Sequence, residues 1–225
     1  MKERGIIFNA EMVRAILDGR KTQTRRVMNN QPCTLSGETI SVQQDDFNFR
    51  WAGDLHNDTS GWFPCPLGKV GDRLWVRETW SVVSHEFDDD GLMIDYVPDR
   101  PTKSVHEMPY GHGYYTGHVI YFADGAFTWG DDDGCIDGRS CWKPSIHMPR
   151  WASRITLEIT DVRVERLKDA NDNDFKAEGY PLERELTGGS MDPFCWFRNL
   201  WDSVSPTNFK YEDNPWVWVI EFKRI

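Results

Sequence analysis

The chain has 225 residues, of which 39% are hydrophobic, and its formal net charge is −10 at pH 7. This size allows one sizeable core, or one core with a small satellite, and we expect a single domain over residues 1–225. No apolar run approaches the roughly 20 residues that cross a bilayer, and the first eight residues lack the apolar region of a signal peptide. Five cysteines, an odd number, favour a reducing compartment over a disulfide framework. These features predict a cytoplasmic protein without a membrane partner.

The charge is unevenly distributed along the chain. Residues 1–26 hold seven basic and three acidic side chains, whereas residues 85–140 hold twelve acidic and three basic ones. The acidic segment largely cancels long-range attraction to a polyanion. A nucleoside or a short, exposed nucleotide therefore suits this balance better than a long duplex.

The first predicted element is a helix over residues 10–18, ended by Gly19. Its apolar residues recur at helical spacing, namely Met12, Val13, Ile16 and Leu17. The helix is followed by the motif Gly-Arg-Lys-Thr-Gln-Thr-Arg-Arg at residues 19–26. Four cations and two hydroxyls in eight residues form a mixture that a hydrophobic core does not require.

Within this motif, Lys21 and Thr24 are three residues apart. If the helical turn continues past Gly19 they face each other, as in a hydroxyl activated by a lysine. A lysine acts as a general base only when its pKa is drawn toward neutrality, and burial next to other cations has that effect. The alternative is a solvated basic loop, because lysine and arginine mostly lie at protein surfaces.

The middle of the chain predicts two insertions around one strand. Residues 27–70 are rich in Asn, Gln, Gly and Pro and predict a long loop with one hairpin. A turn at residues 69–72 leads into a half-buried strand at residues 73–77. Residues 81–140 form an acidic, glycine-rich insertion with a strand at residues 118–122.

The last third alternates strands and helices. We expect a long bent strand at residues 155–167, a short capped helix at 169–178 that stops at Gly179, a helix at 192–204 and a closing strand at 216–222. Four tryptophans in these periodic patterns are assigned to packing, namely Trp196, Trp201, Trp216 and Trp218.

Four segments resemble the ASCH domains, small β-barrels related to the PUA domains that bind RNA. They are residues 19–25, 71–80, 155–160 and 216–223. The long form, with Pro-Ser-Ile-His-Met-Pro-Arg-Trp-Ala-Ser-Arg at residues 144–154, is similar to ASCH proteins encoded by tailed phages and prophages. The resemblance implies an α+β fold, with a PUA-like β-barrel, flanking helices and the large acidic insertion.

One branch of that family comprises compact bacterial N4-acetylcytidine amidohydrolases, whose proposed catalytic set is a lysine, a threonine three residues later and a distant glutamate. Lys21 and Thr24 match the first two, and a count forward from Thr160 places the third on Glu178. The resemblance implies hydrolysis of an acylated nucleoside or base without a cofactor. Lys21 is then the base, Thr24 the nucleophile or positioner of water, and Glu178 the proton relay.

Other side chains in or beside these motifs are expected to bind substrate. They are Arg20, Arg25, Arg26, Trp75, Arg77, Glu78, Trp80, His147, Arg150 and Trp151. A tryptophan among them is expected to wall the pocket or stack on a base. Two of them also have a structural interpretation. Glu78 would form an ion pair with Arg77 or Arg154, and His147 would be a hydrogen-bonded residue of a turn.

Several other chemistries are excluded by motif. The spacing of Cys33, Cys65, Cys135, Cys141 and His147 contains no Cys-x-x-Cys pair, so no metal site is predicted. The chain also lacks the nucleophile-elbow, phosphate-loop and dinucleotide motifs.

The main alternative function is a noncatalytic RNA- or nucleotide-binding module of phage origin. In that case the same cations contact the phosphates of a single-stranded nucleic acid and the aromatic residues stack on its bases. A third hypothesis is an assembly or accessory role during phage growth. It is based only on the description of the similar phage proteins as morphogenetic. The sequence leaves the oligomeric state open.

Overall fold

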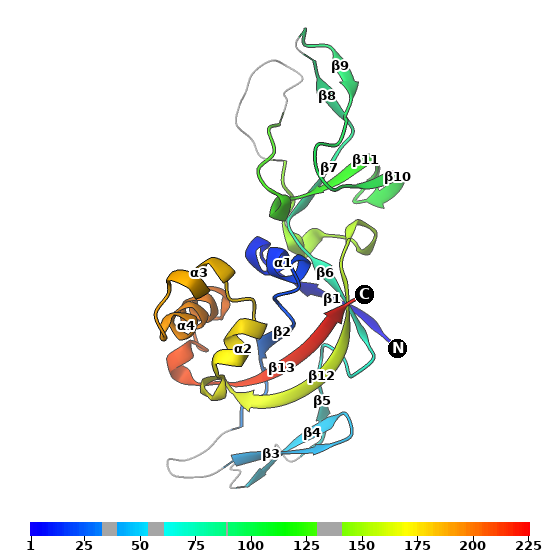
Figure 1. The fold of residues 1–225 in the computed structure, drawn as a ribbon. Coiled ribbons are helices and arrows are strands. Elements are labelled where there is room, and N and C mark those ends of the chain that lie inside the picture. Colours follow the sequence, from blue (N-terminus) through cyan, green and yellow to red (C-terminus); the bar gives the residue numbers. More distant parts are fainter. Residues whose placement is uncertain (33–39, 54–60, 89, 130–140) are drawn as a thin grey trace. The chain divides into compact units, whose positions relative to one another are not determined.

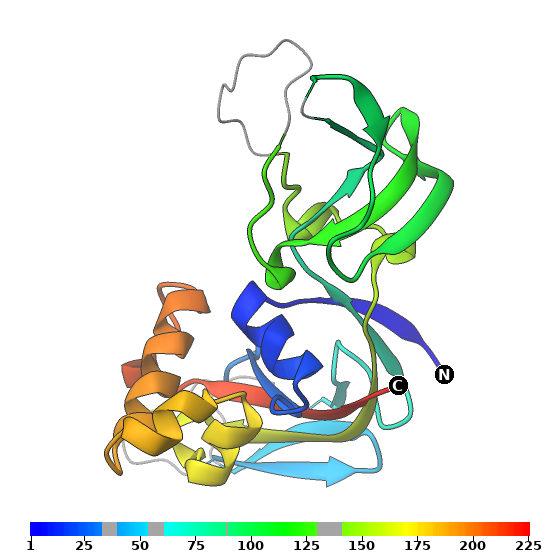
Figure 2. The ribbon, with the colours of Figure 1, turned by 45° about the horizontal axis from the view of Figure 1, so that its top comes forward.

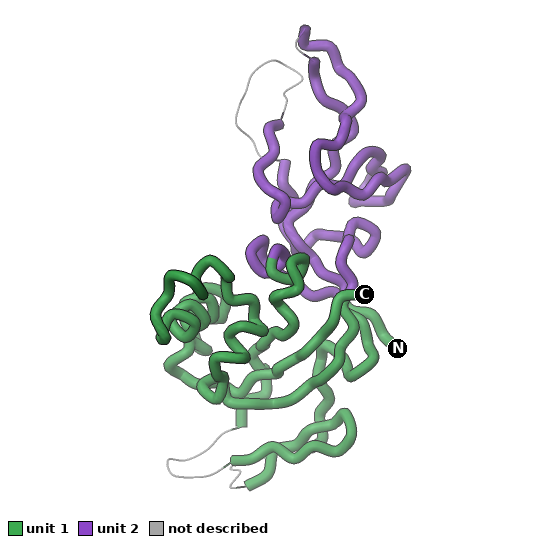
Figure 3. Tube along the Cα trace, viewed as in Figure 1, with its two compact units in different colours: residues 1–4, 15–74, 157–225 green, residues 5–14, 75–156 purple. Residues whose placement is uncertain are grey.

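The computed structural model describes residues 1–32, 40–53, 61–88, 90–129 and 141–225. It is a mixed α+β structure, rich in sheet and with few helices. None of the helices in these ranges is long and apolar enough to cross a membrane. The chain divides into two compact units: unit 1 comprises residues 1–4, 15–74 and 157–225, and unit 2 comprises residues 5–14 and 75–156 (Figure 3). A single domain over residues 1–225 stays a prediction.

The largest sheet has five strands in the order β1-β6-β12-β13-β2. Their bounds are β1 (Glu3–Ile7), β6 (Arg73–Arg77), β12 (Thr156–Arg166), β13 (Trp216–Arg224) and β2 (Gln23–Val27). β13 pairs antiparallel with β12 on one side and with β2 on the other. Within the described ranges β1 and β2 are edge strands, so the sheet stays open. The closed barrel that the resemblance implied is not formed by these strands.

In unit 1 the sheet separates helices from a second, smaller sheet, because successive side chains of β13 point to opposite faces. Val217 and Val219 pack against the helices, in a core with Leu167, Phe175, Phe197, Trp201 and Tyr211. Trp216 and Trp218 pack on the other face, against the rings of Trp51 and Phe49. Figures 1 and 2 show the same division, with the helices on one side of β12 and β13 and the β3–β4 hairpin on the other.

The helices and small strands of unit 1 have the following bounds. The helices are α2 (Asp172–Ala177), α3 (Leu182–Thr187) and α4 (Asp192–Val204), with short 3-10 helices at Leu167–Asp169 and Tyr211–Asp213. The small antiparallel sheet contains β3 (Ile40–Asp45), β4 (Asn48–Gly53) and β5 (Phe63–Pro64). The hairpin expected within residues 27–70 is therefore confirmed.

Unit 2 is built on a three-stranded antiparallel sheet in the order β10-β11-β7. Its strands are β7 (Trp80–Val83), β10 (Lys103–Tyr110) and β11 (Gly113–Tyr121), and a separate hairpin contains β8 (His85–Phe87) and β9 (Met93–Asp95). Three 3-10 helices lie at Phe122–Asp124, Ser145–His147 and Arg150–Ala152. The strand expected at residues 118–122 falls within β11 and the next residue, while residues 130–140 of the insertion lie outside the described ranges.

Local patterns predicted the other elements closely. The strand at residues 73–77 and the helix at 192–204 have the expected bounds. The bulge between Ile159 and Asp161 is the register change expected in the long strand. The helix expected at residues 169–178 is shorter, because Asn171 caps α2 and the preceding residues form a 3-10 turn. Trp201 and Trp218 are buried as predicted, and Trp196 and Trp216 are half-buried.

Candidate functional site

The basic motif at residues 19–26 leaves helix α1 (Ala10–Leu17) in a sharp turn. The Gly19 N–H donates to the Ile16 carbonyl and the Arg20 N–H donates to the Ala15 carbonyl, with Gly19 at φ 75°. This left-handed conformation suits a residue without a Cβ, so Gly19 ends the helix as predicted. The helical turn does not continue, and Lys21 and Thr24 do not face each other across one. Thr24 lies instead in strand β2.

The turn brings Lys21 into direct contact with Glu178. The Lys21 Nζ donates to Glu178 Oε2 at 2.6 Å and to the Glu178 backbone carbonyl at 2.9 Å. The side chain of Lys21 is 0% exposed and that of Glu178 is 4% exposed. Two of the three predicted catalytic residues, 157 positions apart in the chain, therefore form one buried ion pair.

The end of α2 is shaped for this contact. Glu178 is the C-terminal cap of α2, and Gly179 follows it at φ +104°. A Cβ on Gly179 would lie 2.9 Å from the Ala15 Cβ and 3.2 Å from the Lys21 Cβ, closer than side chains normally pack. Arg20 holds the same segment, since its Nη1 donates to the Gly179 carbonyl at 2.9 Å. Arg20 was predicted to bind substrate, and here it positions the segment that carries Glu178.

Burial lowers the pKa of Lys21 below its ordinary value of 10.5. The Glu178 carboxylate acts in the opposite direction, and the nearby Arg26 and Arg25 guanidiniums add to the lowering. A charged ammonium is unfavourable in a dry environment, whereas the neutral amine is not. Lys21 thus has the environment of a lysine that can accept a proton.

Arg25 is occupied by carboxylates. Its Nη1 lies 3.4 Å from Glu178 Oε1, and its Nη2 lies 3.1 Å from Asp174 Oδ1 and 3.3 Å from Glu165 Oε2. The Arg25 side chain is 1% exposed. The prediction that Arg25 contacts substrate is therefore not supported by its position. Asp174 and Glu165 were absent from the predicted site.

Thr24 is also buried, at 2% exposed, but it points to the other face of β2. In the sheet Thr24 lies opposite Ile220, and Arg25 lies opposite Val219. Neighbours along a strand face opposite sides, so Thr24 shares its face with Arg26. Burial lowers the pKa of Arg26. Arg25 and Arg26 lie on opposite faces of β2, and the positive charge of each lowers the pKa of the Lys21 amine.

In unit 2, Glu78 forms an ion pair with Arg154, one of its two predicted alternatives. Arg154 Nε and Nη2 each donate to a Glu78 oxygen at 3.0 Å, and Nη1 donates to Asp124 Oδ2 at 2.7 Å. The guanidinium also lies 3.9 Å from the centre of the Tyr121 ring. Burial raises the pKa of Glu78 even though Arg154 opposes the shift.

The aromatic residues expected to bind a base differ in accessibility. Trp80 is 0% exposed and is surrounded edge-on by the rings of Tyr110, Tyr115 and Trp151, so it belongs to the core of unit 2. Trp75 is half-buried, and the guanidiniums of two arginines predicted to bind substrate, Arg77 and Arg150, lie 5.4 and 6.0 Å from its ring.

The other predicted binding residues of unit 2 are Arg77, Arg150, His147 and Trp151. Arg77 Nη2 donates to the Ile146 carbonyl, and both Arg150 and His147 are exposed in short 3-10 helices. The Trp151 indole N–H donates to the Pro109 carbonyl at 3.0 Å. The predicted site residues are thus divided between the two units.

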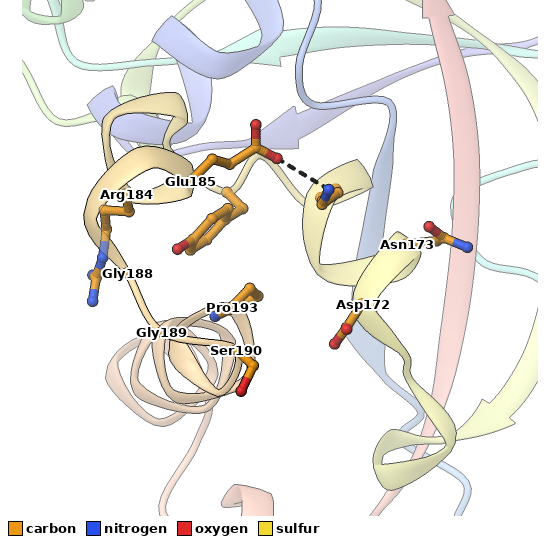
Figure 4. Close-up of a pocket in the computed structure, with 10 residues that line it drawn as sticks. Asp172, Asn173, Arg184, Glu185, Gly188, Gly189, Ser190 and Pro193 are labelled. Carbon is orange, nitrogen blue, oxygen red and sulfur yellow. Dashed lines mark ion pairs between the residues drawn. The ribbon is translucent and has the colours of Figure 1, made fainter.

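A pocket of about 600 Å³ lies among α2, α3 and the start of α4 (Figure 4). Its lining has mixed charge, and Lys176 and Glu185 form an ion pair across it at 3.2 Å. The residues that line this pocket do not include Lys21, Thr24 or Glu178.

The described part of the chain contains no group of three or more His, Cys, Asp or Glu residues arranged to hold a metal ion. Cys33 and Cys135 lie outside it. No protein-family model, curated protein or solved structure matches this chain. The ASCH resemblance therefore stays a proposal that depends on its motifs.

Proposed function

We propose that this chain is an ASCH-type amidohydrolase that removes an acyl group from the amine of a base, with N4-acetylcytidine as the model substrate. The observation that carries the proposal is the buried contact between Lys21 and Glu178 at 2.6 Å, where burial lowers the pKa of the lysine. A purely structural ion pair gains nothing from an environment that lowers the pKa of its cation. A general base requires one.

In the proposed mechanism, neutral Lys21 takes a proton from the Thr24 hydroxyl or from a water molecule held by it. The resulting oxygen attacks the acyl carbonyl. Lys21 hands its proton to the Glu178 carboxylate along their 2.6 Å contact, and the C–N bond breaks as Glu178 passes that proton to the departing amine. When Thr24 is the nucleophile, water then hydrolyses the acyl ester on its oxygen. The net reaction adds one water to the amide and yields a carboxylic acid and the free base.

Arg26 is the best candidate to stabilise the negative oxygen that forms during attack. It shares the face of β2 with Thr24, whereas Arg25 is held by three carboxylates on the other face. A preorganised cation in a dry site stabilises such a charge far more than it does in water. No step of this sequence requires a metal ion or an organic cofactor.

The test is hydrolysis of N4-acetylcytidine by the purified protein, followed by chromatography. Lys21→Met should lower turnover by on the order of 10²- to 10⁴-fold, the usual contribution of a general base. Thr24→Val keeps the branched shape but removes the hydroxyl, and it should be similarly impaired. Lys176→Met is the matched control, because Lys176 lies two residues before Glu178 with a side chain that is 57% exposed.

Absence of turnover by the folded wild-type protein at high enzyme concentration would exclude this substrate. Binding of a single-stranded RNA oligonucleotide, unaffected by Thr24→Val, would then favour the noncatalytic module of phage origin. Turnover that survives Lys21→Met would instead remove the general base from the mechanism.

A further inference from the structure

Arg25 links the catalytic pair to a network of charges on the helix-facing side of the sheet. It contacts one carboxylate of β12 and two from α2 and its C-terminal cap, namely Glu165, Asp174 and Glu178. Its side chain is 1% exposed. An arginine stays protonated at every working pH, and its planar donors fix the orientation of the carboxylates they contact.

The strand register explains why these groups meet. Directly opposite residues of neighbouring strands share a face, and Arg25, Val219 and Arg163 occupy one such row across β2, β13 and β12. Val219 packs against the helices, so Arg25 and Arg163 point toward them as well. Side chains two residues apart on a strand share a face, so Gln23 lies on the same face as Arg25 and Glu165 on the same face as Arg163.

Arg163 forms the outer end of the network. Its Nε and Nη1 donate to Glu165 and Glu221, each at 2.5 Å, and its Nη2 donates to Gln23 at 3.0 Å. Gln23 in turn donates to Asp174 at 3.2 Å. Two of the three carboxylates that hold Arg25, Glu165 and Asp174, are therefore held themselves, and the guanidinium has a fixed position.

Each oxygen of the Glu178 carboxylate faces a different cation. Oε2 accepts from Lys21 at 2.6 Å, and Oε1 lies 3.4 Å from Arg25. We propose that Arg25 is a positioning residue, which holds the second oxygen of Glu178 so that the first remains on Lys21. The inference rests on the proposed function, because it assigns Arg25 a role in orienting the proposed proton relay.

The network also sets the charge around Lys21. Charged groups on the surrounding elements include Asp18 and Arg20 after α1, Arg25 and Arg26 of β2, Asp174 and Lys176 of α2 and its cap Glu178, Asp161, Arg163 and Glu165 of β12, and Glu221 of β13. Burial acts to raise the pKa of Asp174, but the Asn171 backbone N–H and the Arg25 guanidinium outweigh burial and lower the pKa below its ordinary value. Asp174 therefore stays ionised at neutral pH. Loss of Arg25 removes a positive charge beside Lys21 and also removes one of the cations that compete with Lys21 for Glu178. Both changes favour the protonated amine.

The experiment compares Arg25→Gln with Arg163→Gln. Both remove a guanidinium from the same network, but Arg163 makes no contact with Glu178 among the interactions of the described residues. The first measurement is the pH dependence of kcat/KM with N4-acetylcytidine. The second is the titration of the Lys21 ε-methylene by NMR in protein labelled with ¹³C-lysine, with the signal assigned by its loss in Lys21→Met.

We expect Arg25→Gln to move the Lys21 titration and the rising limb of kcat/KM to higher pH. At pH 7 the rate should fall about tenfold, as it does when the neutral fraction of a general base falls tenfold. Arg163→Gln should shift both midpoints clearly less, because Arg163 contacts Glu165 and Asp174, whereas Arg25 contacts Glu178 itself. An unchanged Lys21 titration in folded Arg25→Gln would overturn the proposal.

Arg25→Lys covers the case in which Arg25→Gln does not fold. Lysine keeps the charge but loses the planar fork, so a positioning role predicts a lower kcat at an unchanged KM. An unchanged kcat would show that Arg25 has a merely structural role. If the wild-type protein has no turnover, the proposed function fails, while the NMR titration still decides whether Arg25 controls Lys21.

Discussion

Each of the two units contains a buried glutamate paired with a cation, and the pairs differ in which cation they use. Glu178 of unit 1 meets Lys21 through one oxygen, at 2.6 Å. Glu78 of unit 2 meets Arg154 through both oxygens, each at 3.0 Å. A guanidinium cannot lose its proton in a protein, whereas a buried ammonium can. Proton transfer is therefore available to the first pair and not to the second.

The surrounding charges act in opposite directions in the two pairs. Around Glu178, Arg25 and Arg26 add positive charge and lower the pKa of Lys21 further. Around Glu78, Asp124 adds a negative charge. Burial lowers the pKa of Arg154, but Glu78 and Asp124 outweigh that effect and raise it. Burial, aided by Arg25 and Arg26, thus favours deprotonation of Lys21 in unit 1, whereas the two carboxylates beside Arg154 stabilise a permanent ion pair in unit 2.

The largest expected effect on stability comes from removing the cation of the second pair. Arg154→Met leaves the buried Glu78 and the half-buried Asp124 without their cation, and should lower the free energy of unfolding by about 3–5 kcal/mol. Lys21→Met should be milder, because Glu178 keeps its contact with Arg25. Guanidinium chloride unfolding of the two variants at neutral pH makes the comparison. Equal losses would show that Arg25 does not compensate for Lys21.

A smaller loss is expected from Gly179→Ala at the end of α2. The new methyl would meet Ala15 at 2.9 Å on a backbone at φ +104°, so we expect about 1–3 kcal/mol from strain and overpacking. Gly19→Ala is the matched control, since Gly19 also has a positive φ, +75°, but no atom within 4 Å of an added Cβ.

Both variants carry the strain of a positive φ, so the difference between their stabilities measures the cost of crowding at the segment that brings Glu178 to Lys21. Thermal unfolding measures stability, and hydrolysis of N4-acetylcytidine measures the activity proposed for Lys21 and Glu178. Gly179→Ala should lose activity as well as stability, whereas Gly19→Ala should lose stability only. An active Gly179→Ala protein would show that the pair tolerates displacement.

Sequence patterns predicted the elements whose evidence is local. Alternation identified the strand at residues 73–77, and helical spacing identified α4. The pairing of β13 with β2 and the open edges of the main sheet depend on contacts between distant segments, which periodicity does not encode. The barrel expectation came from the resemblance rather than from any such contact.

In the candidate site, too, the sequence predicted some residues and missed the role of others. The motif resemblance placed Lys21 and Glu178 in one set, and the structure brings them into contact. The role of Arg25 was missed because β2 has no apolar alternation, so residues 23–26 were not recognised as a strand. One signal was available: Asp161, Arg163 and Glu165 alternate on β12, which is typical of a charged strand face that requires charged partners.

The smallest expected effects are opposite pH dependences of stability in the two pairs. Burial lowers the pKa of Lys21 below 10.5, so the unfolded chain binds its proton more tightly. The stability that Lys21 contributes is therefore present above pH 10.5 and is lost as the pH falls through the lowered folded pKa. Relative to Lys21→Met, the wild-type protein should become more stable as the pH rises through this window.

Glu78 should show the reverse. Burial raises its pKa above 4.5, so its contribution is present below pH 4.5 and is lost as the pH rises through the raised folded pKa. Relative to Glu78→Gln, the wild-type protein should become less stable as the pH rises in that range. Urea unfolding at a series of pH values, with each variant subtracted from the wild type, gives the two slopes. A stability difference that stays constant with pH for Lys21→Met, while the one for Glu78→Gln falls with rising pH, would mean that Glu178 cancels the effect of burial on the pKa of Lys21. Lys21 would then be a permanent cation like Arg154.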